Sequence, residues 1–302
     1  MLATCGCGPK NLASPAVPAG AWDWQNLHGQ GFETPHYAIY TTVRDDAVVQ
    51  RFAATMEAAH AKYEQLVPRR LSGDRRLKIY LFAEHSEWAA YTVATTGKDS
   101  EAYLSVFTGG YTIRDEFVCW MGTELDTLGV AAHEGFHQFV ARHFHSRLPP
   151  TLEEGLATTF ENISISDTAV TINTTANGRR QLALRRAIDE NYLIPFDTFI
   201  QLHAGDLAGR SPELIEAFYA QAWALARLLR DEPGYRLGFM QMMKDIAAGS
   251  QLLDIGPGDG SQVYYPSRVR PVLQRYVAPD WSKFTADYDA FIRRVARQPV
   301  EQ

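Results

Sequence analysis

The chain has 302 residues, of which 46% are hydrophobic and 21% charged, and its formal net charge is −6. A chain of this length and apolar content can bury a large core, which excludes global disorder. No segment of about 18 uncharged apolar residues occurs that could span a bilayer. The acidic balance, without a run of five like charges, argues against a protein that binds nucleic acid by neutralising phosphates.

Residues 1–20 are small, rich in proline and without apolar periodicity, which predicts a disordered leader. Within this leader, Leu2-Ala3-Thr4-Cys5 resembles the lipobox of bacterial lipoproteins, which makes Cys5 a candidate lipid anchor. A working export signal needs a basic segment and about 7 to 15 apolar residues before that box, whereas only Met1 precedes it here. We expect an exported or cell-envelope protein, with an ordinary terminus of a cytoplasmic protein as the alternative.

Strand and helix patterns follow in two blocks. Strand patterns lie at 36–43, 77–82, 103–107, 111–113 and 117–121, with a helical pattern from Val48 to Leu66 between the first two. Beyond Thr123 the sequence is almost wholly helical, with apolar stripes at 128–144, 152–160, 182–188, 214–229, 239–246 and 281–295. This order predicts an α+β fold with a sheet-containing lobe over 21–145 and a helical lobe over 146–302.

The segment His133-Glu134-Gly135-Phe136-His137 lies inside the helical stripe at 128–144. Residues four apart share one face of a helix, so the two imidazoles can converge on one metal ion with Glu134 beside it. Thr123 and Asp126 form a capping box that can start this helix. The alternative, two core histidines without a metal, would bury two imidazoles and a carboxylate on one face, which is costly unless each group is paired.

A catalytic zinc site has three protein ligands and leaves one position for water, so a third ligand is needed. His143 has the spacing of the third histidine in HExxHxxGxxH sites, but Val140 stands where that turn needs a glycine. Glu154, in a helix expected after Pro149-Pro150, is the competing candidate, although an acid at this place can also serve in a capping box. Glu153 projects about 100° away from Glu154 around that helix, which argues against it as the ligand.

The HEGFH segment and Glu154-Gly155-Leu156-Ala157, with 16 residues between His137 and Glu154, together resemble a known family. They are similar to the gluzincin metallopeptidases, and more closely to the peptidase-MA-like group, whose second motif reads approximately WLxEGLAxxxE. The resemblance implies a thermolysin-like zincin fold, zinc held by His133, His137 and Glu154, and Glu134 as the general base of peptide hydrolysis. It also implies that Glu161 supports the ligands from behind. The chain departs from the motif at Thr151, in place of tryptophan, and at Thr158, in place of aspartate.

In the same group a helix of the type Tyr-Ala-Gln-Ser-Trp follows the zinc motifs, and Tyr219 to Trp223 reads Tyr-Ala-Gln-Ala-Trp here. The resemblance makes Tyr219 a candidate donor to the oxyanion that forms when a carbonyl is attacked. A buried aromatic stripe is the alternative for Tyr219, and Tyr111 and His203 are substitute donors. A peptide or protein substrate is expected to pair as an added strand with 111–113 or 117–121.

A rival motif lies at 252–260, where LLDIGPGDG resembles the glycine-rich loop of S-adenosylmethionine-dependent methyltransferases. Only 42 residues follow Gly260, and Pro266, Pro271 and Pro279 oppose the helices and strands that such a fold needs. The sequence therefore favours a zinc peptidase. A catalytically degenerate zinc-containing module is the alternative, and a methyltransferase is a remote one.

Overall fold

The computed structural model describes residues 16–67, 75–104, 109–113, 115–166, 169–207, 209–250, 254–257 and 263–300. Cys5 and most of the predicted leader lie outside these residues. The leader nevertheless ends earlier than predicted, because residues 17–20 belong to a strand that pairs with residues 31–33 of the next strand.

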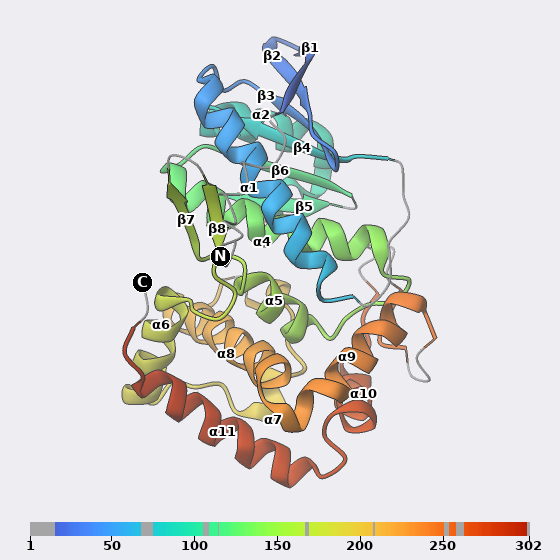
Figure 1. The fold of residues 1–302 in the computed structure, drawn as a ribbon, viewed down its shortest axis with the longest axis vertical. Coiled ribbons are helices and arrows are strands. Elements are labelled where there is room, and N and C mark those ends of the chain that lie inside the picture. Colours follow the sequence, from blue (N-terminus) through green and yellow to red (C-terminus); the bar gives the residue numbers. More distant parts are fainter. Residues whose placement is uncertain are drawn as a thin grey trace, which may run out of the picture.

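A six-stranded mixed sheet forms one half of the molecule, which confirms the α+β class (Figure 1). Its strands run in the order β1-β2-β3-β4-β6-β5, with β3 and β4 parallel, β4 and β6 parallel, and the other neighbours antiparallel. Their bounds are β1 Val17–Trp24, β2 Leu27–Glu33, β3 Tyr37–Thr41, β4 Leu77–Phe82, β5 Gly110–Ile113 and β6 Glu116–Trp120. Because β6 already has two neighbours, the prediction that a substrate could pair with 117–121 is wrong. Of the two strands named in that prediction, only β5 lies at an edge of the sheet; the other edge is β1.

Alternating side chains of the sheet pack against helices on both faces. Ile79 and Leu81 of β4 belong to the core shared with α1 (Asp46–Glu64) and α4 (Glu124–His143). Phe82 packs on the opposite face in a cluster with Trp88 of α2 (His85–Thr96). The strand predicted at 103–107 is wrong where it is described, because Tyr103 lies in the short helix α3 (Ser100–Leu104).

The second half of the chain is mainly helical. It contains α5 Pro150–Thr158, α6 Gly178–Asp189, α7 Phe196–Phe199, α8 Pro212–Asp231, α9 Pro233–Ala248, α10 Val269–Tyr276 and α11 Trp281–Arg297. A hairpin of β7 (Ile163–Ser166) and β8 (Ala169–Ile172) interrupts the helices and was not predicted. Pro271 also departs from expectation: it lies in the first turn of α10, where its missing N–H has no acceptor within the helix. In the rival methyltransferase motif, only 254–257 is described, and it lies in irregular chain between α9 and α10.

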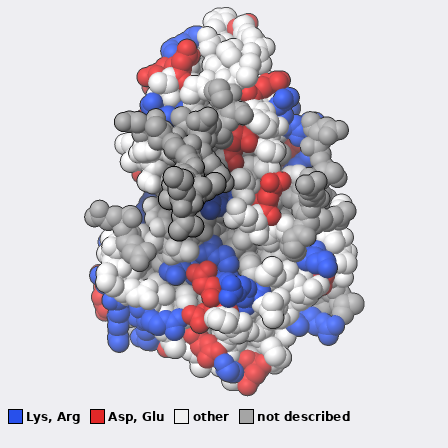
Figure 2. All heavy atoms as spheres, viewed as in Figure 1, with Lys and Arg blue, Asp and Glu red and all other residues white. Residues whose placement is uncertain are grey.

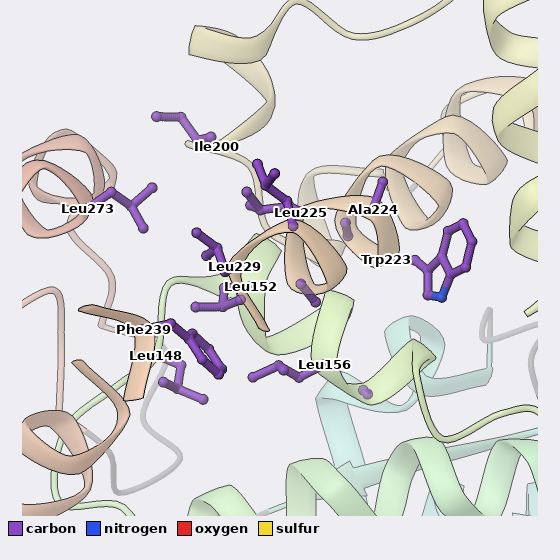
Figure 3. Close-up of a cluster of buried hydrophobic side chains, with 14 of the residues drawn as sticks. Leu148, Leu152, Leu156, Ile200, Trp223, Ala224, Leu225, Leu229, Phe239 and Leu273 are labelled. Atoms are coloured by element: carbon purple, nitrogen blue, oxygen red, sulfur yellow. The ribbon is translucent and has the colours of Figure 1, made fainter. Parts of the chain in front are cut away.

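Helix α8 runs through the centre of the helical half. Leu152 and Leu156 of α5 approach Leu225 and Leu229 of α8 in one buried cluster (Figure 3). The same cluster includes Phe136 of α4, so the core is continuous across the lobe boundary predicted at residue 145, which stays a prediction.

The surface seen in Figure 2 carries both signs of charge side by side over the helical half. None of the helices in the described parts of the chain is long and apolar enough to cross a membrane.

Candidate metal centre

Helix α4 places the two motif histidines on one face. The helix starts at the predicted cap, where the Thr123 side chain accepts a hydrogen bond from the Asp126 backbone N–H, and it continues unbroken to His143. The Nε2 atoms of His133 and His137 lie 3.3 Å apart. Gly135, between them, lets α1 approach closely, since a Cβ there would lie 2.6 Å from Met56 Cε. The i, i+4 spacing therefore brings the imidazoles together as predicted.

Helix α5 brings Glu154 to the same place. Pro150 occupies the first turn of α5, as expected for a residue that needs no hydrogen-bond acceptor there. Gly155 lies directly against α8: a Cβ at this position would be 2.0 Å from the backbone oxygen of Ala222. Glu154 Oε2 is 3.2 Å from His133 Nε2 and 3.5 Å from His137 Nε2.

His133, His137 and Glu154 form a metal group: they could hold a metal ion, because one donor atom from each lies within a single small space. His133 is buried and the other two are mostly buried, with exposed side-chain fractions of 11% for His133, 18% for His137 and 12% for Glu154. Glu154 Oε2 is also a buried oxygen that accepts no hydrogen bond of good geometry from the described residues. A buried acceptor without a donor is unfavourable, and a cation would satisfy it.

Two further carboxylates hold the other nitrogens of the two rings. His133 Nδ1 lies 3.0 Å from Glu161 Oε1, and His137 Nδ1 lies 2.9 Å from Glu153 Oε1. A carboxylate can only accept, so each Nδ1–H donates, and in the neutral form of each ring the Nε2 lone pair is left for a metal. Glu161 has the supporting place that the resemblance implied. Glu153 is not part of the metal group, as predicted, but its contact with His137 was missed.

The two histidines and the carboxylates around them shift one another's pKa values. Burial alone would raise the pKa of the Glu154 carboxyl, but the positive charges of the two histidines, whose Nε2 atoms face it, hold that pKa well below its usual range. Burial likewise opposes protonation of His133, yet the neighbouring carboxylates of Glu154 and Glu161 raise its pKa to about 9. Burial raises the pKa of Glu134 above its ordinary value, against the attraction of the two imidazoles.

Three other side chains surround this group. Tyr219 of α8 places its ring 6.2 Å from the His133 ring, centroid to centroid, and burial raises the pKa of its phenol well above 10, so it stays a proton donor. The guanidinium carbon of Arg180 lies 5.0 Å from the centre of the Tyr219 ring. Thr112 Oγ1 of β5 donates to the backbone oxygen of Glu134 at 3.0 Å, which ties the edge strand to α4.

The remaining predicted candidates lie elsewhere. His143 is in the last turn of α4, where its ring packs on Phe139, and the sharp turn that would return it to the metal group does not form. Tyr111 is wrong as a substitute donor, because its hydroxyl donates to Thr92 of α2 on the other face of the sheet. The ring of His203 packs on Tyr264, and its role as a substitute donor stays a prediction.

Arg180 and Asn177 were missed by sequence reasoning, although both contact Glu161. Asn177 carries one local signal, since it caps α6 by accepting from the Arg180 backbone N–H. Nothing local predicts that these residues reach Glu161, which lies on another element.

Comparison of the chain with protein-family models, with curated proteins and with solved structures gives no match.

Proposed function

We propose that the protein is a zinc-dependent peptidase, in which His133, His137 and Glu154 hold Zn²⁺. The observation that carries this proposal is the spacing of the three donor atoms. Ligand atoms about 2.0 to 2.1 Å from a tetrahedral zinc ion lie about 3.3 to 3.4 Å from each other. The corresponding separations here are 3.2, 3.3 and 3.5 Å.

The composition of the donor set supports a catalytic rather than a structural role. Structural zinc sites are usually closed by four protein ligands rich in cysteine, whereas two histidines and one glutamate leave a position open. Bound zinc supplies a Lewis acid and a water whose pKa is lowered to about 7. The carboxylates of Glu153 and Glu161 orient the imidazoles for this role.

Glu134 is the proposed general base. It follows His133 on α4, and the charges of His133, His137 and Glu154 act on its carboxyl. Its raised pKa suits a group that takes a proton from the attacking water and then gives it to the leaving amine. Tyr219, as a protonated phenol close to His133, is the proposed donor to the oxyanion of the attacked carbonyl.

The proposed substrate is a peptide or protein in extended conformation. Strand β5 lies at one edge of the sheet and has one strand neighbour among the described strands. Thr112 of β5 also bonds to Glu134, so a chain that pairs with β5 runs beside the proposed base.

The test is metal analysis combined with a peptide-library assay. We expect the purified wild type to carry one zinc per chain and to cleave peptides, and Glu134→Gln to keep the zinc but lose at least about 100-fold in turnover. His143→Ala, a histidine change on the same helix outside the metal group, should keep both. Zinc without any hydrolysis in the wild type would overturn the peptidase in favour of the degenerate zinc-containing module.

A further inference from the structure

One carboxylate behind the metal group accepts an unusual number of hydrogen bonds. Glu161 Oε1 lies 3.0 Å from His133 Nδ1 and 2.6 Å from Arg180 Nη2. Its Oε2 accepts from Arg180 Nε at 2.9 Å and from Asn177 Nδ2 at 3.0 Å. The two donors from Arg180 form a bidentate fork, which fixes the plane of the carboxylate as well as its position.

Arg180 is itself buried, with 9% of its side chain exposed, and Glu161 is its only ion-pair partner among the residues the structure describes. The guanidinium also lies 5.0 Å from the ring centre of Tyr219. A buried ion pair is weak evidence of a stabilising role, because desolvation offsets much of the attraction. The contacts of Arg180 explain the arrangement better. It binds Glu161, which holds His133, and it lies beside Tyr219, the proposed oxyanion donor.

The start of helix α6 explains how Arg180 reaches this place. Asn177 Oδ1 accepts from the Arg180 backbone N–H at 3.1 Å and so caps the helix. The Asn177 amide donates to the backbone oxygen of Thr158 at the end of α5 and to Glu161. Asn177 therefore ties the start of α6 to the end of the helix that carries Glu154.

We propose that Arg180 is a positioning residue for the metal centre. Its guanidinium fixes Glu161 as the acceptor of the His133 Nδ1–H, which directs the His133 Nε2 lone pair toward the metal, and it holds the Tyr219 ring beside His133. The inference deepens the proposed function, and it rests on that function only in taking His133, His137 and Glu154 as metal ligands.

The experiment compares three single variants. Arg180→Met removes charge and fork, Arg180→Lys keeps the charge but loses the fork, and Arg179→Met changes the adjacent exposed arginine as the control. Zinc affinity is measured by competition with a chromophoric chelator, and site geometry by the visible absorption of the cobalt-substituted protein. Loss of a group behind a histidine ligand typically weakens metal binding by about 10- to 100-fold. We expect a loss in that range for Arg180→Met with an altered cobalt spectrum, a smaller loss for Arg180→Lys, and wild-type values for Arg179→Met.

A double-variant cycle separates positioning from a general loss of stability. Because Arg180 acts through Glu161, Arg180→Met combined with Glu161→Gln should weaken zinc binding by no more than about twofold beyond Glu161→Gln alone. Should the two effects add in full, or should Arg180→Met bind zinc as the wild type does with an unchanged cobalt spectrum, the inference is overturned. If Arg180→Met does not fold, Arg180→Lys takes its place in the cycle.

These readouts separate the two proposals, because zinc affinity and the cobalt spectrum need no turnover. A wild type that binds zinc but cleaves nothing overturns the peptidase and leaves the role of Arg180 to be decided by the cycle. A wild type that binds no zinc overturns both.

Discussion

Two adjacent glutamates of α5 approach the same imidazoles from different sides. Glu154 Oε2 faces both Nε2 atoms, whereas Glu153 Oε1 lies beside Nδ1 of His137. Their places around the helix, about 100° apart, explain why only one of them can enter the metal group. The contact between Glu153 and His137 cannot be predicted from the sequence, because it depends on how α5 crosses α4.

His60 of α1 gives a prediction about stability and pH. It is 4% exposed, its ring stacks on His36 with centroids 3.9 Å apart, and its buried Nδ1 has no hydrogen-bond partner among the described residues. Burial lowers its pKa to about 4, from an ordinary value of 6.5. Between pH 6.5 and 4 the unfolded chain therefore binds a proton that the folded chain does not, and acidification through this window destabilises the fold by up to about 3 kcal/mol.

Two other histidines near His60 also make the stability of the fold depend on pH, and they do so in opposite directions. Burial also lowers the pKa of His143, to about 4, so it adds to the loss over the same window. The hydrogen bond to Glu57 raises the pKa of His36, so its contribution is complete below pH 6.5 and is lost as the pH rises through the raised value. The variant His60→Leu replaces the buried imidazole with an apolar side chain, so it removes the protonation of His60 and leaves His36 and His143 in place. Urea unfolding at pH 6.5 and pH 4 should show a loss about 2 to 3 kcal/mol smaller for the variant than for the wild type; parallel losses in the two proteins would contradict the prediction.

At the scale of elements, the parts predicted best are those whose signal is local. The helix at 128–144 and its Thr123 cap follow from spacing along the chain, and the observed α4 agrees with them. Helix α2 was missed because it buries only Trp88, Tyr91 and Thr92, too few for an apolar stripe. The β7–β8 hairpin was missed because its strands pair only with each other and bury little.

The contact between α5 and α8 carries a second prediction. A Cβ on Gly155 would lie 2.0 Å from the Ala222 backbone oxygen, and no rotation of a side chain can relieve a clash with backbone. Gly155→Ala should therefore force the helices apart, lower the free energy of unfolding by about 3 kcal/mol, and weaken zinc binding because Glu154 moves with α5. Gly234→Ala in the first turn of α9 is the control, since a Cβ there meets nothing within 4 Å. Equal thermal stability of the two variants would show that α5 is not held by this contact.

At the scale of the whole molecule, the metal group joins the two halves of the fold. The histidines come from α4, which packs on the sheet, whereas Glu154 comes from α5, which packs on α8 in the helical half (Figure 1). The α+β class followed from the order of strand and helix patterns. The network of Glu161, Asn177 and Arg180 did not follow from that order. It joins Glu161 to Asn177, 16 positions away, and to Arg180, 19 positions away, and it buries charged side chains that look like ordinary surface residues in the sequence.

Because one ion would join both halves, removing it should lower the stability of the whole molecule. A ligand that binds only the folded state stabilises it by about 4 kcal/mol when its free concentration is about 1,000 times its Kd. For a chain of this size such a change corresponds to a shift of roughly 5 to 10 °C in Tm. We expect EDTA to lower the Tm of the zinc-loaded protein by that amount in a calorimetric scan and zinc to restore it. Glu134→Gln, which keeps all three ligands, should show the same shift, whereas His137→Ala should melt at one temperature with or without EDTA. A zinc-loaded wild type whose Tm does not respond to EDTA would contradict a metal that links the two halves.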